Sequence, residues 1–517
     1  MLFSRVSAQS TAIPEKRLSC LESHNAKRPT RIRYLFQLAC GGRGCAGKSG
    51  TQTRPVTLDE ISTSDYDRRP FAGTVSARKT LTSSIFNSAA PVPSMSTASA
   101  EARTESSDPY IQSLFAERIG GANYGKGTEI YKFEKIKRAK RKALADHPDR
   151  QLLDFGIGEN DSMAAESIRQ TMQREINRVE NRGYADNGGA EYKEAAARFM
   201  QRNFGVDLDP AKQINHCIGS KPAYAMLPAC FINPGDVTMM TVPGYPVAGT
   251  HTQYYGGDVY KLPLLAENHF LPDLDAIPDD IYRRTKLMVL NYPNSPTGGT
   301  APAEFFEKVV ALAKEKEFVV VNDAAHVMLT FDGKPRSFLE TPGALDVGVE
   351  VHSMSKGYDM IGWRMGFVAG HPLIVQAFAD VKDNSDSGQF IATQKAAAAA
   401  LDDDSIPQQI RAKYRRRMEK LVNVLRGAGF EAEMPGGTYF LYTPSPNATA
   451  AGETFAAAED ATRFLIEQLG IVTVPWDDAG AFLRFSVTYI AEDEAAEDAL
   501  MAETASRLAG ASFQWKS

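Results

Sequence analysis

The sequence predicts an α/β protein built around a mostly parallel β-sheet, and two observations carry that prediction. Short apolar runs recur along the chain, at residues 237–242, 286–290, 318–321 and 347–351. Runs of this kind are typical of strands that are covered on both faces, as in a parallel sheet. Stretches with helical spacing, such as 302–316, lie between them. Strands and helices therefore alternate as they do in a doubly wound fold.

A second, smaller α+β domain is predicted after about residue 411. The chain has 517 residues, which is enough for more than one domain. A helical stretch after residue 411 is followed by shorter candidate strands at 438–442 and 482–487. The alanine run at 396–400, just before this region, is predicted to be a packed helix.

The bulk composition argues against several classes of partner. Hydrophobic residues make up 43% of the chain and charged residues 23%, with a net charge of −5. These values are ordinary for a globular protein and give no reason to expect nucleic acid. No apolar run approaches the roughly 20 residues of a membrane-spanning helix. The five cysteines form neither a disulfide framework nor a metal-binding pair, so we expect a reducing compartment and no metal. The basic stretch at 130–144 is better explained as a solvated helix face than as a nucleic-acid surface.

Residues 1–100 differ in composition from the rest of the chain. They are rich in Ser, Thr, Ala, Arg and Lys, and the first 57 residues contain only two acidic residues, Glu15 and Glu22. This composition indicates an organellar transit peptide, and the alternative is a disordered tail without a targeting role. The composition does not separate a plastid from a mitochondrial address.

The same leader contains a complete match to the phosphate-loop pattern G-x-x-x-x-G-K-[ST], at residues 42–49. A working phosphate loop needs a buried strand before it and a helix after it, so that backbone amides converge on phosphate. The following residues, 50–55, are a poor helix start, and no globular sequence surrounds the motif. We therefore interpret the match as chance.

Three side chains in the body suggest cofactor chemistry. Lys356 follows the apolar run at 347–351, and a lysine in a partly buried cleft can lose its proton and form an imine. Arg364 has a planar guanidinium group, which can make paired hydrogen bonds with a phosphate. Asp323 ends an apolar strand, where a carboxylate is costly unless a cation such as a protonated pyridine nitrogen pairs with it. Lys356 alone is more simply a surface lysine, and Asp323 alone a helix cap, so the hypothesis depends on the order and spacing of the residues together.

That combination resembles the class I/II aminotransferases of pyridoxal 5′-phosphate (PLP) fold type I, from about residue 120 to the C-terminus. The resemblance implies that Lys356 is the Schiff-base lysine, that Ser353 and Arg364 bind the cofactor phosphate, and that Asp323 binds the pyridine nitrogen. Asp323 and Lys356 are the expected catalytic residues.

Two further motifs complete the expected cofactor site. Pro243-Gly-Tyr245-Pro is similar to the family segment whose aromatic ring stacks on the cofactor. Gly219-Ser220-Lys221 is similar to the turn whose backbone amides hold the phosphate at a helix N-terminus. The resemblance therefore places Tyr245, Ser220 and Lys221 among the cofactor-binding residues.

The resemblance also implies how the substrate and a second subunit are bound. Tyr184, in the segment 183–189, corresponds to a tyrosine that reaches the phosphate of the neighbouring subunit, which implies a homodimer with shared sites. Arg484 corresponds to the arginine that clamps the substrate α-carboxylate, and the backbone at Gly158 closes on the same carboxylate.

The implied fold has a large domain with a mostly parallel seven-stranded sheet covered by helices, and a small α+β domain made from N- and C-terminal segments. We expect a leader at 1–100, an N-terminal arm with part of the small domain at 101–165, the large PLP-binding domain at 166–405, and the C-terminal small domain at 406–517.

Two positions depart from the family pattern, and both face the same cofactor atom. The residue before Pro-Thr-Gly is Ser295 where the family has Asn, with Asn294 displaced by one. Three residues after Asp323 the chain has His326 where the family has Tyr. Both family residues bond the phenolic oxygen. Ser and His can still donate hydrogen bonds, so neutral drift and a retuned acidity of the lysine–cofactor link both remain open.

Within the superfamily, the stretches 131–136, 242–251, 381–389 and 474–480 resemble LL-diaminopimelate aminotransferase of the bacterial and archaeal type. In that family a Tyr and a Lys reach the far end of the substrate, and Tyr131 and Lys221 occupy those places here. The resemblance implies glutamate as amino donor, tetrahydrodipicolinate as acceptor and a role in lysine biosynthesis, which favours a plastid stroma as the location.

Alternatives are an aminotransferase for aspartate, alanine or aromatic amino acids, and a PLP-dependent lyase of the same fold. Two other classes are a PLP-sensing regulator and a phosphate-loop NTPase. The regulator is disfavoured because residues 1–100 show no helix-turn-helix pattern.

Overall fold

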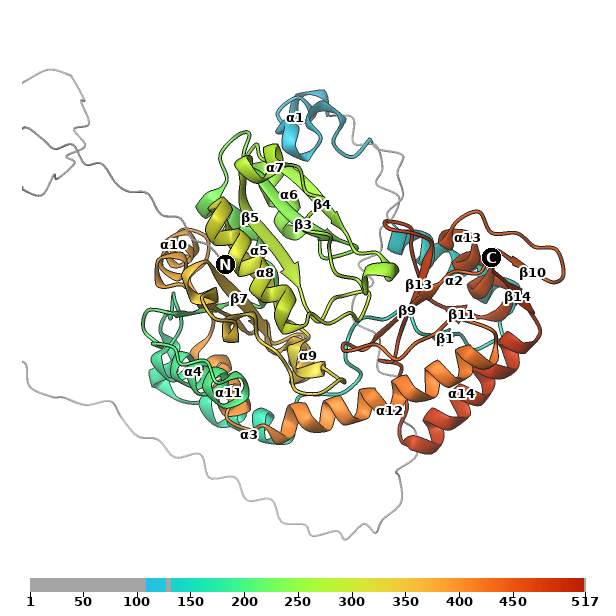
Figure 1. Ribbon diagram of the computed structural model, residues 1–517. Coiled ribbons are helices and arrows are strands. Elements are labelled where there is room, and N and C mark those ends of the chain that lie inside the picture. Colours follow the sequence, from blue (N-terminus) through green and yellow to red (C-terminus); the bar gives the residue numbers. More distant parts are fainter. Residues whose placement is uncertain (1–107, 127–131, 516–517) are drawn as a thin grey trace, which may run out of the picture. The chain divides into compact units, whose positions relative to one another are not determined.

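Seven strands form the central sheet, in the order β2-β8-β7-β6-β5-β3-β4 (Figure 1). Their bounds are β2 (Ile214–Cys217), β3 (Val237–Val242), β4 (Asp258–Pro263), β5 (Thr285–Asn291), β6 (Val319–Asp323), β7 (Gly348–Ser353) and β8 (Gly366–Gly370). Strands β3 to β7 are parallel to their neighbours within that group, and β8 runs antiparallel to both β2 and β7. The prediction of a mostly parallel seven-stranded sheet is confirmed.

Helices cover both faces of this sheet, which explains why its strands are apolar throughout. One face packs against α5 (Ser220–Phe231), α6 (Val247–Tyr254) and α10 (Pro372–Asp383). The other packs against α4 (Ala190–Phe204), α8 (Ala303–Lys316) and α11 (Ile391–Leu401). The alanines at 396–398 and 400 are buried in α11, as expected for a packed helix. The part of the chain that contains this sheet also includes α3 (Glu166–Glu175), α7 (Asp279–Arg284) and α9 (Met354–Gly357).

A three-stranded antiparallel sheet, β12-β13-β9, forms the centre of the smaller α+β part. It consists of β9 (Phe440–Pro444), β12 (Val474–Trp476) and β13 (Phe482–Ser486), with α12 (Ser405–Gly427), α13 (Ala458–Leu469) and α14 (Glu494–Ala509) nearby. The N-terminal segment joins it through β1 (Leu153–Asp154), which pairs in parallel with β11 (Ile471–Val472), and through α2 (Lys132–Asp146), which packs on α13. The small part is thus built from both ends of the body (Figure 1). The short elements α1 (Pro109–Gln112), β10 (Ala448–Thr449) and β14 (Phe513–Gln514) complete the chain.

This computed structural model describes residues 108–126 and 132–515. The chain divides into two units, Met1–Met95 and Ser96–Ser517, and all described residues lie in the second. The predicted leader, its phosphate-loop match and Tyr131 lie outside the described residues. Among the described helices, none is long and apolar enough to cross a membrane.

One strand prediction was wrong at its start. The run at 438–442 was expected to be a strand, but β9 begins at Phe440. Thr438 has a φ of 69°, in the left-handed region that a β-strand does not use. The basic stretch predicted at 130–144 is helix α2, which buries Ile136 and Ala143.

Candidate active site

The carboxyl ends of the parallel strands bring the predicted site residues to one edge of the sheet. Asn291 at the end of β5 lies beside Asp323 at the end of β6, and Ser353 ends the next strand, β7. In open α/β sheets this edge is where ligands bind. The chain therefore places the candidate lysine, carboxylate and phosphate ligands around one crevice.

Lys356 lies in the short helix α9, at a point where three chain segments meet. The Ser353 hydroxyl caps this helix by accepting a hydrogen bond from the Ser355 amide at 3.2 Å. The half-buried Lys356 Nζ donates to the Gly158 carbonyl at 3.1 Å. The Tyr439 hydroxyl donates to the same carbonyl at 2.8 Å, and its ring centre lies 5.4 Å from Lys356 Nζ. Gly158 and Tyr439 thus hold the amine over the crevice.

An anion-binding cradle lies at the start of α5. Ser220 is the first residue of this twelve-residue helix, so its free backbone amides and the helix dipole favour a phosphate there. Gly219, with a φ of 75°, precedes it, and a Cβ at this position would collide with the Arg364 guanidinium. Arg364 Nη1 donates to the Ser355 hydroxyl at 3.3 Å and to a backbone carbonyl at 2.8 Å. Lys221 is exposed beside this turn.

Asp323 forms the opposite end of the crevice. It is 7% exposed, and burial raises its pKa to about 6, although its Oδ1 accepts a hydrogen bond from the Ala325 amide at 3.0 Å. A small cavity next to it is lined by Asp323, Tyr224, Tyr245 and Asn291 among others. The buried Tyr224 hydroxyl lies close enough to Asp323 to act against this rise in the carboxyl pKa. A cationic ring nitrogen in this cavity would relieve the cost of burying the carboxylate.

His326 lies beside the Lys356 crevice and is neutral. It is 5% exposed, and burial lowers its pKa to about 3, with the Lys356 and Arg484 charges adding to the effect. Its ring packs edge-on against Tyr439 at 5.3 Å, and its Nδ1 has no partner in the described part of the chain. In a neutral imidazole one ring nitrogen donates and the other accepts, so the tautomer decides which role Nδ1 has.

Asn294 does not replace the asparagine that is missing at position 295. It is fully buried, and its Oδ1 accepts hydrogen bonds from the Thr297 amide at 3.1 Å and the Thr297 hydroxyl at 2.8 Å. These bonds fix the turn after β5. Ser295 is half-buried, and its amide donates to Asn291 Oδ1 at 2.8 Å. The departure found in the sequence is therefore a real change of side chain at this edge.

Arg484, on β13, is a buried cation without a carboxylate partner among the described residues. It is 6% exposed, and its Nη2 donates to the Gly156 carbonyl at 2.8 Å. Its guanidinium carbon lies 4.3 Å from the centre of the Phe440 ring, and its Nε has no hydrogen-bond partner in the part of the chain that the structure describes. Burial lowers its pKa to about 10, so it remains charged at neutral pH. Such a group is suited to an anionic substrate, and Gly158 lies two residues after its carbonyl partner.

Three of the predicted residues, Tyr184, Tyr245 and Lys221, are exposed. Tyr184 is 86% exposed, on a segment held by a bridge between Ala185 and Gly388. Tyr245 is 42% exposed at the edge of the cavity beside Asp323.

Sequence reasoning missed Tyr224 and Tyr439. Tyr224 follows Ser220 by one helical turn, so it faces the sheet from the same helix. That spacing could have indicated it. Tyr439 reaches Gly158 across 281 positions, and no local pattern signals such a contact.

The sequence was compared with protein families and with known relatives. The family model described as aminotransferase class I and II matches residues 150–500. The chain belongs to the class I and II aminotransferases. A relative from Methanocaldococcus jannaschii, named LL-diaminopimelate aminotransferase, is 51% identical over 418 residues, covering 79% of this chain and 100% of the relative. One of the same name from Syntrophobacter fumaroxidans is 38% identical, covering 69% and 92%.

Solved structures agree with this assignment. Substrate-bound BacF from Bacillus subtilis is 28% identical with a TM-score of 0.69, covering 78% of this chain and 99% of that one. A mutant aspartate aminotransferase from Thermus thermophilus is 25% identical with a TM-score of 0.67, covering 77% and 99%.

PLP is the cofactor of this aminotransferase, and the residues present fit it. The Gly219–Ser220 turn, Ser353 and Arg364 would hold the phosphate, since Gly219 leaves room that a Cβ would fill. Asp323 would pair with the pyridine nitrogen, and Lys356 would carry the covalent link. Tyr224 lines the cavity beside Asp323, and His326 lies near Lys356 with its ring against Tyr439.

Proposed function

We propose that this aminotransferase interconverts LL-2,6-diaminopimelate and tetrahydrodipicolinate, with glutamate and 2-oxoglutarate as the other pair. Buried Arg484, which has no counter-ion in the described chain, supports a substrate with an α-carboxylate beside Lys356. The names of the 37–51% identical relatives support diaminopimelate as that substrate.

The side chains divide the chemistry among them. The cofactor, when bound, supplies an aldehyde that links to amines and a ring that accepts negative charge from the α-carbon. Arg484 and the Gly156–Gly158 backbone orient the substrate by its carboxylate. Lys356 Nζ takes the proton from the substrate α-carbon. It can do so because it lies over the crevice, where its hydrogen bond within the described chain is the one that it donates to the Gly158 carbonyl at 3.1 Å. Asp323, as a carboxylate, keeps a proton on the ring nitrogen.

A coupled assay of the holoenzyme tests the substrate. LL-2,6-diaminopimelate with 2-oxoglutarate is compared with aspartate, alanine and phenylalanine, and we expect diaminopimelate to have the highest kcat/KM. No turnover of diaminopimelate beside turnover of another amino acid would reject the substrate and keep the aminotransferase. Release of the amino group as ammonia would indicate a lyase instead.

The site itself is tested separately through Lys356→Ala. We expect this variant to lose the covalent cofactor absorbance after dialysis and to lose at least about 10³-fold in activity. Its melting temperature in the absence of cofactor should match that of the wild type, because Lys356 is not part of an ion pair in the described chain.

We also propose that the enzyme is a homodimer in which Tyr184 reaches the partner subunit's cofactor phosphate. The family resemblance of the segment 183–189 supports this, and the 86% exposure of Tyr184 in one chain leaves its ring accessible to a second subunit. Light scattering after gel filtration should give twice the chain mass. In Tyr184→Phe the cofactor affinity should fall several-fold with the dimer intact, and a monomeric wild type would overturn the proposal.

The leader composition and the proposed substrate together favour a plastid stroma, which we propose as the location. Residues 1–100 fused to a fluorescent protein should direct it to plastids. Accumulation in mitochondria would support the alternative address, and a diffuse signal would favour an untargeted tail.

A further inference from the structure

Asn160 joins two parts of the candidate active site through its side-chain amide. Its Nδ2 donates one hydrogen bond to the Lys356 carbonyl at 2.8 Å and another to the Asp359 carboxylate. An amide nitrogen carries two protons, so both are used here. A backbone carbonyl can only accept, which fixes the orientation of this amide. Asn160 is therefore held between the residue that is expected to carry the cofactor and a carboxylate three residues further on.

Asp359 occupies a backbone position at which an aspartate is unusual. Helix α9 ends at Gly357, and Asp359 follows it with a φ of 53°, in the left-handed region. Glycine or asparagine is the common choice just after a helix end, because these residues adopt this conformation most readily. Burial raises the pKa of Asp359 to about 6, although the hydrogen bond from Asn160 and the charge of Lys413 act against this rise. At neutral pH the side chain is thus a carboxylate, which accepts the Asn160 hydrogen bond.

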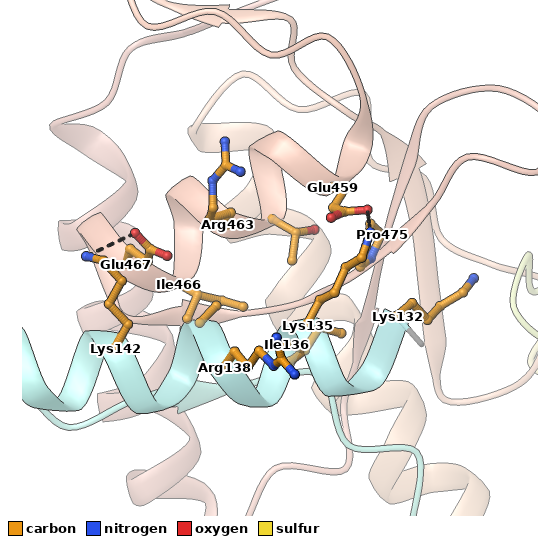
Figure 2. Close-up of a pocket in the computed structure, with 12 residues that line it drawn as sticks. Lys132, Lys135, Ile136, Arg138, Lys142, Glu459, Arg463, Ile466, Glu467 and Pro475 are labelled. Atoms are coloured by element: carbon orange, nitrogen blue, oxygen red, sulfur yellow. Dashed lines mark hydrogen bonds and ion pairs between the residues drawn. The ribbon is translucent and has the colours of Figure 1, made fainter. Parts of the chain in front are cut away.

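The segment that contains Asn160 is anchored in the smaller part of the molecule on both sides. Before it, β1 pairs with β11, and α2 packs on α13. Two ion pairs between these helices are Lys135–Glu459 at 2.8 Å and Lys142–Glu467 at 3.4 Å (Figure 2). After it, the Asp161 carboxylate accepts hydrogen bonds from three side chains of α12, which are Lys413 at 2.7 Å, Tyr414 at 3.0 Å and Arg417 at 3.1 Å. The Asn160 side chain thus projects from a fixed part of the chain.

The same segment also holds the Lys356 amine. The Gly158 carbonyl, two residues before Asn160, accepts the hydrogen bond from Lys356 Nζ at 3.1 Å. Residues 158–160 therefore contact Lys356 both at its backbone and at the end of its side chain. A lysine side chain is long and flexible, so fixing both of its ends restricts where the amine can lie. The position of a reacting group matters, because a misplacement of about 1 Å can cost about 100-fold in rate.

We propose that Asn160 and Asp359 are positioning residues for Lys356. Asp359 orients the Asn160 amide, Asn160 fixes the Lys356 backbone, and the Gly158 carbonyl holds the amine whenever it is not joined to the cofactor. Both residues act through Lys356 and not by touching the cofactor or the substrate. This inference rests on the proposed role of Lys356 and requires no particular amino acid as substrate.

The test measures how fast the cofactor-free full chain links to added PLP, as the lysine amine and the aldehyde form an imine and release water. The absorbance of the imine follows this reaction. Asp359→Gly keeps the left-handed backbone and removes the acceptor, so we expect the rate to fall about 10-fold. Asp359→Asn keeps an acceptor oxygen and the backbone conformation, so it should stay within about 2-fold of the wild type. Asn160→Ala should be at least as slow as Asp359→Gly, and the double variant should match it, because Asp359 acts through Asn160.

The affinity for pyridoxamine 5′-phosphate separates positioning from general damage to the site. This compound has the same ring and phosphate as PLP, but its amine cannot link to Lys356. Its Kd should therefore be the same in the wild type and in Asp359→Gly. A parallel loss of this affinity would show that the pocket itself is damaged and would overturn the proposal. An unchanged rate of linkage in Asp359→Gly would also overturn it, because that is the result expected if Asp359 only ends helix α9.

Glu317→Gly is the matched control, because Glu317 is an exposed residue with a φ of 57° at the end of α8. The same substitution in the same backbone conformation should leave both measurements unchanged. A slower linkage in this control would trace the effect to glycine itself and overturn the assignment to Asp359. Retention of the covalent link in Lys356→Ala would reject Lys356 as the anchor, before Asn160 or Asp359 is changed. Failure of diaminopimelate as a substrate affects none of these measurements, so the two proposals fail separately.

Discussion

Two arginines in the smaller part of the molecule are both buried, but only one of them has carboxylate partners among the described residues. Arg417, on α12, is 2% exposed and donates to Glu497 Oε1 at 2.7 Å, to Asp161 Oδ2 at 3.1 Å and to two backbone carbonyls. Arg484 is 6% exposed and donates to one carbonyl, with no carboxylate partner among the described residues. Burial acts to lower the pKa of both arginines. In Arg417 the Glu497 and Asp161 carboxylates outweigh burial, so its pKa is raised, whereas the pKa of Arg484 is lowered.

The difference separates a structural charge from a charge kept ready for a ligand. A buried ion that has its partners stabilises the fold cooperatively, and removing one partner leaves another charge unpaired. A buried ion without partners costs stability, and it persists because a ligand supplies the missing charge.

The largest effect on stability is expected from Arg417→Met. This change removes the most deeply buried cation beside Glu497 and Asp161, which keep Arg416, Lys420 and Lys413 as partners. It should lower the free energy of unfolding by about 3 kcal/mol, at the lower end of what breaking a buried ion pair costs. Urea denaturation of the cofactor-free protein measures this. A loss below about 1 kcal/mol would contradict the view that this arginine is structural.

Arg484→Met should have the opposite pattern. Removing an unpartnered buried cation should leave the unfolding free energy unchanged or slightly higher. The value of kcat/KM for amino-acid substrates should fall about 100-fold, because the charged contact to the α-carboxylate is lost. Steady-state kinetics tests the expected fall in kcat/KM, and urea denaturation of the same preparation tests the unfolding free energy. A large fall in stability would mean that Arg484 is a structural arginine like Arg417.

Of the two arginines, the sequence predicted the role of Arg484 but gave no sign of the role of Arg417. Arg484 was identified through its motif, and Asp323 and Lys356 through their positions at strand ends, because β-branched runs reveal the strands. Arg417 lies in a run of three arginines, 415–417, and nothing local shows which one is buried. Its partners Asp161 and Glu497 come from both ends of the body. Such long-range pairing depends on tertiary packing.

In the fold, too, local patterns predicted some strands and missed others. The central parallel strands were predicted because both of their faces are buried. Strand β4 was missed because only one of its six residues is buried, and β8 because it is short and bounded by glycines. The neutral state of His326 likewise comes from burial and from neighbouring cations that are distant in sequence.

Glu497→Gln should alter the pH dependence of stability. Although burial opposes it, hydrogen bonds from Arg416 and Arg417 lower the pKa of Glu497 to about 2, from its usual 4.5. A depressed carboxyl pKa contributes stability that is fully present above about pH 4.5 and is lost as the pH falls towards 2. We expect the wild type to exceed the variant by about 2 kcal/mol at pH 7, after allowance for the exposed partners.

Urea denaturation of both proteins between pH 7 and pH 3 measures this difference. It should narrow steadily below pH 4.5, because protonation removes the charge that the variant already lacks. A difference that is constant over this range would mean that Glu497 acts through packing alone.

The smallest effects are expected for the two tyrosines. Tyr414→Phe removes a hydroxyl that donates to Asp161 at 3.0 Å, so it should cost about 1 kcal/mol of unfolding free energy. Tyr224→Phe removes a buried hydroxyl that acts on Asp323, whose pKa burial raises to about 6, so the cofactor-free protein should lose less stability, below about 0.5 kcal/mol. Its affinity for PLP should instead fall a few-fold, because the hydroxyl lies beside Asp323 in the ring cavity. Equal losses of stability in the two variants would remove the distinction between a hydroxyl that stabilises the fold, at Tyr414, and one that lies at the cofactor site, at Tyr224.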